Sequence, residues 1–430
     1  MEQINNRLIS YASILEDQTR HQAVQTATMP FIHPHIALMP DAHLGKGSTV
    51  GSVIPTLGAI MPAAVGVDIG CGMIAVKTQF NQNDFRWSDR PLNKLRESIE
   101  NAIPTSAGKY NTDLTSTALS RTDILHHKAI ESAEFDPEEY SANWRLQLGT
   151  LGGGNHFIEI TVDEDDQVWL FLHSGSRGVG NRIANKHIKV AIKQCEKRWI
   201  DLPNPDLAYL VEGDPEFWRY IREMRWAQEF AWFNREEMMD RLIECVSAYV
   251  GVATEVLETI NCHHNYTTVE RHFGKQVWLS RKGAIDATAG KMGLIPGSMG
   301  TASYVVEGLG DPVSLNSSPH GAGRNFSRKK ARETFTHADL REAMRGIEYR
   351  DSDAFIDEIP GAYKDIDVVM ADSVRLVKIK HKLRQMLNVK GDQRERAQPG
   401  FTLGTPHRAH TLRDRVGAAL GGSSHQHQEC

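Results

Sequence analysis

The chain has 430 residues, a hydrophobic fraction of 40% and a formal net charge of −5, so it can bury a sizeable core but is not globally basic. Any binding of nucleic acid must therefore depend on a local basic patch. The absence of an apolar run of about 18 residues excludes a transmembrane helix, and the polar N-terminus argues against a signal peptide. Five scattered cysteines without a C-x-x-C motif predict a cytoplasmic protein without a disulfide framework.

The N-terminal third of the sequence predicts helices and strands in an irregular order. A helix is expected over residues 17–28, and residues 83–145 are polar enough to be partly helix and partly loop. Glycine-punctuated apolar segments, which predict buried strands, lie at residues 35–39, 52–57, 59–67 and 74–78.

A predicted hairpin carries the first candidate ligands. Strands over residues 157–162 and 168–172 flank an acidic turn of four residues, 163–166. This turn would pair Val162 with Gln167 and place His156 opposite His173. Opposed residues on antiparallel strands have Cβ atoms about 5 Å apart on one face, so the two imidazoles could hold one metal ion. A stacked or hydrogen-bonded histidine pair is the alternative.

Two further groups have metal-ligand spacing. Asp68 and Cys71 are expected in a glycine loop at the end of a buried apolar strand, where Gly70 and Gly72 permit the sharp turn that lets both side chains converge. A buried cysteine beside a turn-forming aspartate is the alternative. In residues 261–265, adjacent histidines point in different directions, so only one of them is expected to reach the same ion.

The strongest helical start is Asp214-Pro215, because Asp is a favoured N-cap and Pro a favoured first residue. The helix is expected to continue, with a possible break, towards Val250. Its aromatic residues are interpreted as core rather than as a platform for stacking bases: Trp218, Trp226, Phe230 and Phe233. Beyond Gly391, residues 392–430 have weak periodicity and predict a flexible tail.

A glycine-rich segment, residues 317–324, precedes a basic helix that Ser327 should cap. Backbone N–H groups at such a loop suit phosphate, and Arg324 and Arg328 would add bidentate donors. His320 inside the loop is a candidate nucleophile or general acid. The alternative is an ordinary solvated basic helix face.

These residues together resemble the RtcB family of RNA-splicing ligases. The resemblance covers residues 28–391, in order, and several of its motifs are six or more residues long. The matching segments are residues 39–47, 67–73, 148–156, 173–177, 261–265, 295–300, 320–324, 362–367 and 389–391.

The resemblance implies a GTP- and Mn²⁺-dependent ligase that joins RNA 3′-phosphate or 2′,3′-cyclic phosphate ends to 5′-hydroxyl ends. It implies that His320 forms a histidine–GMP intermediate and that two Mn²⁺ ions are held by Asp68, Cys71, His156, His173 and His264, with Cys71 as the bridge. It further implies nucleotide contacts at Asn155, Phe157, Glu159, Ser298, Ser303, His320, Gly321, Ala322, Gly323, Tyr363 and Lys390.

One nucleotide contact conflicts with the predicted hairpin, which places Glu159 on the face opposite His156 although both should serve one site. For RNA phosphates, the expected contacts are Arg177, Arg324 and Arg328. The resemblance also implies a monomer that an archease-like protein could activate.

The expected fold is α+β: one compact RtcB-like domain over residues 1–391, with mixed sheets around a metal cleft and a helical segment, followed by the flexible tail 392–430. Neither a P-loop nor a Rossmann motif is present. Two functions from other classes stay open: a metal-dependent phosphatase or cyclic phosphodiesterase on the same scaffold, and a non-catalytic RNA-binding relative. Only the ligase needs GTP.

Overall fold

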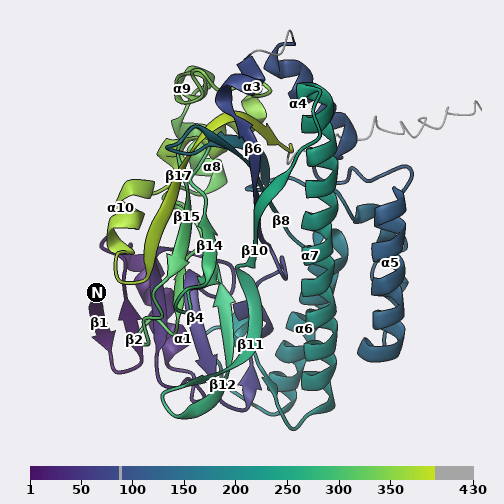
Figure 1. Ribbon diagram of the computed structural model, residues 1–430. Coiled ribbons are helices and arrows are strands. Elements are labelled where there is room, and N and C mark those ends of the chain that lie inside the picture. The colour runs from purple at the N-terminus through teal and green to yellow at the C-terminus, as the bar shows by residue number, and fades with distance from the viewer. Residues whose placement is uncertain (87–89, 393–430) are drawn as a thin grey trace, which may run out of the picture. The chain divides into compact units, whose positions relative to one another are not determined.

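The computed structural model describes residues 1–86 and 90–392, which belong to one compact unit. Two β-sheets form its centre, and long helices lie along one side (Figure 1). The predicted α+β fold with mixed sheets is confirmed. The predicted flexible tail lies outside the described residues, except for Asp392.

The first sheet contains six strands in the order β1-β2-β3-β4-β12-β11. Its β2–β3 pair is parallel, whereas the other pairs are antiparallel. The strands are β1 (Glu2–Asn5), β2 (Leu8–Ser10), β3 (Ile36–His43), β4 (Val50–Thr56), β12 (Lys275–Lys282) and β11 (Asn265–His272).

The second sheet contains seven antiparallel strands in the order β10-β6-β8-β7-β17-β15-β14. The strands are β10 (Val256–His263), β6 (Gly72–Asn81), β8 (Gln167–Ser174), β7 (Phe157–Val162), β17 (Val377–Lys390), β15 (Ser303–Gly308) and β14 (Met292–Ile295). Two small sheets pair β5 (Ala59–Ile60) with β9 (Leu210–Val211) and β13 (Ala284–Asp286) with β16 (Ser317–Pro319).

Strand alternation buries both faces of the second sheet. On β6, Met73 and Ala75 pack into the core that this sheet shares with the first, together with Met39 of β3. Ile74 and Val76 point the other way, into a core that includes residues of three helices. Because successive strand residues point to opposite faces, a continuous apolar run fits a strand covered on both sides.

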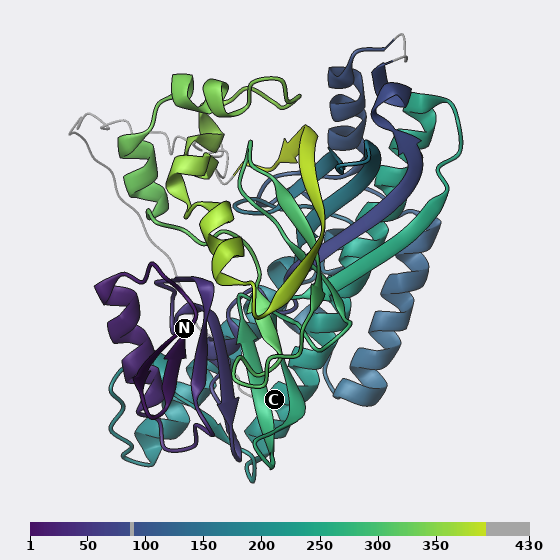
Figure 2. The same cartoon turned by 60° about the vertical axis from the view of Figure 1, so that its left-hand side comes forward.

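The helices that cover the outer face are α4 (Leu92–Ala102) and α7 (Pro215–Val250), with α6 (Arg177–Lys197) and α5 (Ser116–Lys128) beside α7 (Figure 1). Figure 2 shows the N-terminal sheet beside the second sheet. The remaining helices are α1 (Asp17–Ala27), α2 (Pro62–Val65), α3 (Gln82–Arg86), α8 (Arg328–Thr334), α9 (His337–Ala343) and α10 (Ile366–Asp372). Shorter turns of 3-10 helix lie at Pro137–Glu139, Arg145–Gln147, Pro205–Leu207, Asp353–Glu358 and Pro360–Ala362, and a π-helical turn lies at Ala129–Ala133.

The predicted helix from Asp214-Pro215 is confirmed, but it has no break: α7 runs unbroken over 36 residues and ends at Gly251, whose φ is +82°. Trp226 and Phe230 are buried core residues, as predicted. Trp218 was wrongly assigned to the core, since it is 42% exposed. It lies one residue after the buried Phe217, about 100° around the helix and outside the buried stripe.

The hairpin between β7 and β8 forms, but its predicted register is wrong by one residue. Phe157, not His156, is opposite His173. The loop has three residues rather than four, because the Asp163 amide donates to the carbonyl of Gln167 and Asp166 adopts a left-handed φ of +59°. A turn closed by one left-handed residue is a common three-residue hairpin loop.

This register removes the conflict over Glu159. Glu159, Phe157 and His173 now share one face of the sheet. His156 lies just before β7, where the strand alternation does not apply, and its ring still approaches that of His173 with centroids 5.1 Å apart.

The segment before Asp68 was also predicted wrongly. It is not one strand over residues 59–67: β5 ends at Ile60, and the short helix α2 follows. Pro62 occupies the first turn of α2, a position where proline is favoured. By contrast, the predictions of α1 and of a Ser327 cap on α8 are confirmed, since the Ser327 hydroxyl accepts from the Lys330 amide.

Candidate metal and nucleotide site

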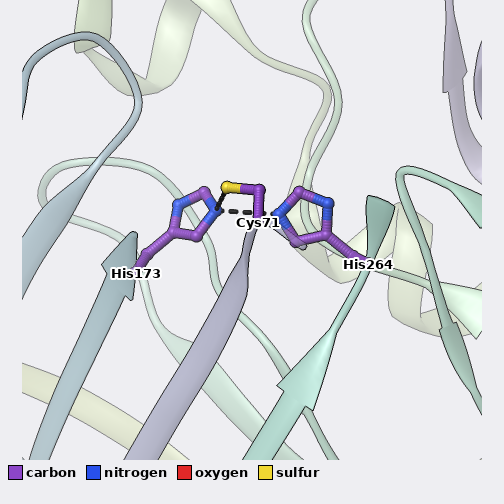
Figure 3. Close-up of side chains that lie close together, drawn as sticks. All are labelled: Cys71, His173 and His264. Atoms are coloured by element: carbon purple, nitrogen blue, oxygen red, sulfur yellow. Dashed lines mark hydrogen bonds between the residues drawn. The ribbon is translucent and has the colours of Figure 1, made fainter. Parts of the chain in front are cut away.

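Three predicted ligands meet because their strands are neighbours. β6 lies between β8 and β10, and the pairing aligns the start of β6 with the ends of the other two. Cys71 directly precedes β6, His173 lies at the end of β8, and His264 follows β10. Figure 3 shows the Cys71 side chain between the two imidazoles.

The five predicted ligands form two overlapping groups that share the Cys71 thiol. In one group, Sγ lies 3.2 Å from Nε2 of His173, which is 2.8 Å from Nε2 of His264. In the other, Sγ lies 3.3 Å from Nε2 of His156, which is 3.0 Å from Oδ2 of Asp68. The structure thus brings all five residues together, whereas their role as ligands stays a prediction.

All three imidazoles turn the same nitrogen towards this centre. For His173 and His264, the oxygen beside Nδ1 favours the proton there and leaves Nε2 as the lone-pair nitrogen. Nδ1 of His156 lies against an oxygen and also 3.2 Å from Nη1 of Arg177, which can only donate. The oxygens are the Leu151 carbonyl for His156 at 2.9 Å, the Asn155 carbonyl for His173 at 3.2 Å and Oδ1 of Asn265 for His264 at 3.2 Å.

This arrangement fits metal ions. With both Nδ1 atoms protonated, the Nε2 lone pairs of His173 and His264 face each other at 2.8 Å, a repulsive contact that a cation between them would make attractive. Thiolate, imidazole and carboxylate are all ligands for first-row divalent metals. The shared sulfur suits a bridge between two such ions.

The charges around the cluster follow from burial. Burial and neighbouring histidines hold the pKa values of His173 and His264 well below the ordinary range. Burial alone would raise the pKa of Asp68, but its contact with His156 and the charge of Arg177 lower that pKa to about 2. Burial and the Asp68 charge raise the pKa of the Cys71 thiol, an effect that a coordinated cation reverses.

Glycines let backbone approach the site closely at two points. A Cβ at Gly175, in the loop between β8 and α6, would overlap the Asp68 carboxylate. Gly323 has a φ of +75°, and a Cβ there would overlap the carbonyl of Asp41. A side chain at Gly175 would therefore displace Asp68, and a side chain at Gly323 would displace Asp41.

His320 lies next to the cluster, with its ring centroid 4.6 Å from that of His264. Its Nδ1 lies 2.7 Å from Oδ2 of the buried Asp41 on β3, and its backbone N–H donates to the same oxygen at 3.2 Å. The angle of this contact is not that of a hydrogen bond, and Nδ1 has no hydrogen-bond partner among the described residues. Asp41 therefore acts on the ring as a nearby negative charge, which favours the proton on Nδ1 and the lone pair on Nε2. Sequence reasoning missed Asp41, although it lies within the matching segment of residues 39–47.

One cavity of about 480 Å³ joins the cluster, His320 and most of the predicted nucleotide contacts. Ser303 is the exception: it is buried outside the lining, and its hydroxyl accepts from the Gly297 amide. The predicted contacts that line the cavity are Asn155, Phe157, Glu159, Ser298, Gly321, Ala322, Gly323, Tyr363 and Lys390.

A buried carboxyl without a full set of partners is part of the cavity lining. Glu159 is 3% exposed, and its Oε1 accepts from the Asn388 amide at 3.0 Å. Its Oε2 has no hydrogen-bond partner among the described residues. Burial raises the pKa of Glu159 to about 8, despite the positive charge of Lys390.

A second buried carboxylate in the lining, Glu358, binds several of the cationic side chains. It accepts from Nζ of Lys390 at 2.8 Å, from the Tyr363 hydroxyl at 2.7 Å and from Arg328. Burial alone would raise the pKa of Glu358, but Lys390, Arg328 and Arg324 lower it to about 2. Glu358 belongs to no matching segment, so no local signal in the sequence identifies it.

The three arginines predicted to contact RNA already have protein partners. Arg324 and Arg328 line the cavity but contact the Glu358 carboxylate. Arg177 is not part of the lining, and its Nη1 lies 3.2 Å from Nδ1 of His156. Their contacts with RNA stay predictions. Among the described residues, no helix is both long and apolar enough to cross a membrane.

Comparisons with known proteins agree with this architecture. Residues 22–391 match the family model described as tRNA-splicing ligase RtcB. The chain is similar to RNA-splicing ligase RtcB of Escherichia coli K12, with 46% identity over 88% of this chain and 95% of the relative. It is also similar to tRNA-splicing ligase RtcB of Methanococcus maripaludis, with 31% identity over 83% of this chain and 87% of the relative.

Proposed function

The chain belongs to the RtcB family of RNA-splicing ligases, and on that premise we propose that it is a GTP- and Mn²⁺-dependent ligase acting through a histidine–GMP intermediate. Its substrates are RNA 3′-phosphate or 2′,3′-cyclic phosphate ends and 5′-hydroxyl ends. An RNA partner follows from the family, whereas an archease-like activator and a monomeric state stay predictions.

The orientation of His320 carries the proposal. Asp41 lies 2.7 Å from Nδ1, which leaves the Nε2 lone pair for attack on phosphorus. A buried carboxylate beside one ring nitrogen favours the tautomer that is protonated there, although the angle of this contact is not that of a hydrogen bond. His320 lines a cavity together with proposed metal ligands and with the buried Glu159 and Lys390.

The chemistry proceeds by three displacements at phosphorus. Nε2 of His320 attacks the α-phosphorus of GTP, forming a P–N bond as the P–O bond to pyrophosphate breaks. An oxygen of the RNA 3′-phosphate then attacks the same phosphorus and releases His320. Finally the RNA 5′-hydroxyl oxygen attacks the 3′-phosphate, loses its proton and expels GMP. A 2′,3′-cyclic end is first opened by water to a 3′-phosphate.

The two ligand groups would hold the metal ions: Cys71, His173 and His264 for one, and Asp68, Cys71 and His156 for the other. When bound, two divalent ions stabilise the attacking and leaving oxygens of an in-line displacement. The thiolate by its softness favours Zn or Fe, so the assignment to Mn²⁺ depends on the family.

Guanine fits the part of the cavity that Glu159 and Lys390 line. Its N1–H and N2–H groups are donors, which suit the ionised form of Glu159, and its O6 and N7 are acceptors, which suit the ammonium of Lys390. Adenine offers an acceptor at N1, which suits only the protonated form of Glu159. The preference for GTP over ATP should therefore increase as the pH rises through the pKa of Glu159, about 8.

The deciding experiment incubates pure protein with Mn²⁺ and α-labelled GTP in the absence of RNA. We expect acid-labile label on the wild-type protein and none on His320→Ala, whose metal content should stay near normal because His320 is not among the proposed ligands. A phosphatase or cyclic phosphodiesterase would act on RNA without retaining label. Label retained by His320→Ala would refute the assigned nucleophile.

A further inference from the structure

The protein is acidic overall, yet one helix is strongly basic. α6 contains six arginines or lysines and a single acidic residue, Glu196, although the whole chain carries a net charge of −5. No other described helix carries as large a positive charge. Lysine and arginine clustered along one helix are the electrostatic mark of nucleic-acid binding.

The position of α6 connects this charge to the active site. The helix begins directly after the loop of Gly175 that encloses Asp68. Further along the helix, three of its residues line the cavity: Asn185, Ile188 and Lys189. Lys46 and Lys282 add positive charge to the same lining. The basic helix therefore leads outward from the reacting centre.

Three exposed lysines on α6 follow one another at intervals of four residues: Lys189, Lys193 and Lys197. Residues four apart are neighbours on a helix surface and are separated by about 6 Å along the axis. None of the three has an ion-pair partner within the part of the chain that the structure describes. Of the other three, Arg182 and Lys186 contact Tyr140, and Arg177 contacts Thr150 and His156.

The row ends beside an unusually exposed aromatic residue. Trp199 follows the last residue of α6 by two positions and is 93% exposed. Its indole stacks on no aromatic ring of a described residue. Single-stranded nucleic acids bind to grooves that combine positive charge along the backbone with aromatic side chains on which bases stack.

We propose that Lys189, Lys193, Lys197 and Trp199, here named the α6 track, bind the phosphodiester backbone and one base of an RNA strand whose end reacts at His320. This deepens the proposed ligase function and rests on it. The α6 track takes over the phosphate contacts first assigned to Arg324 and Arg328, because those arginines are already paired with Glu358.

The test measures RNA binding as a function of salt and needs no catalysis. The variant Lys193→Gln/Lys197→Gln removes two charges outside the cavity. The control Lys275→Gln/Lys378→Gln removes two exposed lysines elsewhere and changes the net charge equally. The second variant, Lys193→Arg/Lys197→Arg, keeps the charge and should keep the binding.

Each lost phosphate contact flattens the slope of log affinity against log salt by about 0.7 for a single strand. The Gln variant should therefore flatten the slope by about 1.4 for RNA of about 20 nucleotides and weaken affinity roughly tenfold at 0.15 M salt. A dinucleotide with a 3′-phosphate spans only about 7 Å, so its binding should not change. Strands ending in a 3′-phosphate and in a 5′-hydroxyl are tested separately, which identifies the strand that uses the track.

Trp199→Ala tests the stacking contact. Its loss should weaken affinity at least fivefold at every salt concentration, leaving the slope unchanged because no charge is removed. A wild-type slope in the Gln variant for both strands, or equal flattening in the control, would overturn the α6 track. Unchanged affinity of Trp199→Ala would overturn the stacking contact. Retention of α-labelled GMP by the wild-type protein is measured in parallel, so failure of the ligase chemistry is distinguished from failure of the track.

Discussion

The substitution Glu159→Gln should make the stability of the protein less dependent on pH. Burial raises the pKa of Glu159 to about 8, against an ordinary value of 4.5. The unfolded chain therefore loses this proton above pH 4.5, while the folded protein keeps it up to about pH 8. The contribution of Glu159 to stability is complete below pH 4.5 and is lost as the pH rises towards 8. Glutamine has the same shape and no such proton.

The size of the effect follows from the shift. One pKa unit corresponds to 1.36 kcal/mol, so between about pH 5 and pH 8 this group costs the wild-type protein roughly 3 to 4 kcal/mol of unfolding free energy. The Glu159→Gln variant does not undergo this loss of unfolding free energy. Every other titrating group is common to both proteins, so it cancels when the two are compared.

The assay is urea unfolding of the metal-free and nucleotide-free proteins across this pH range. The difference in unfolding free energy, variant minus wild type, should increase by roughly 3 to 4 kcal/mol from pH 5 to pH 8. Glu255→Gln, at an exposed position, serves as the matched control and should show no such increase. Parallel pH curves for Glu159→Gln and wild type would refute the burial of an incompletely partnered carboxyl at this site.

Three other substitutions test the site. Asp41→Asn should slow transfer of GMP to His320 by about 10³- to 10⁴-fold, because the amide favours the wrong imidazole tautomer, with metal content unchanged; a loss below tenfold in single-turnover labelling would contradict this role. Cys71→Ala should remove metal from both ligand groups, since they share this sulfur, and full Mn²⁺ occupancy by elemental analysis would overturn the bridge. Gly175→Ala should push a methyl group into the Asp68 carboxylate, weaken metal binding and cost about 1 to 3 kcal/mol of stability. An unchanged metal titration would show that the loop can move aside.

The sequence by itself determined the residue types of the site and the elements that carry them. The predicted ligands and His320 lie in matching segments at strand ends and glycine loops. Local pattern made them candidates, and the resemblance to the RtcB family implied their roles. The start of α7 was also predictable from local sequence, because Asp214 is a favoured N-cap and Pro215 a favoured first helical residue. Local signals also explain the errors, because a loop of three or four residues in the β7–β8 hairpin has nearly the same sequence signature and only the left-handed Asp166 distinguishes them.

Tertiary structure alone decided which groups meet. Asp41 and His320 are far apart in the sequence, and only the position of β3 beside the loop of Gly323 brings them into contact. Glu358 lies in a 3-10 turn without any motif, yet it fixes Lys390 and pairs with the arginines first assigned to RNA. Charge pairing depends on distances of a few ångströms between distant segments, and composition or periodicity does not encode these. For the same physical reason, the sequence shows that α6 is basic, but only the fold shows that its lysines lead away from the reacting centre.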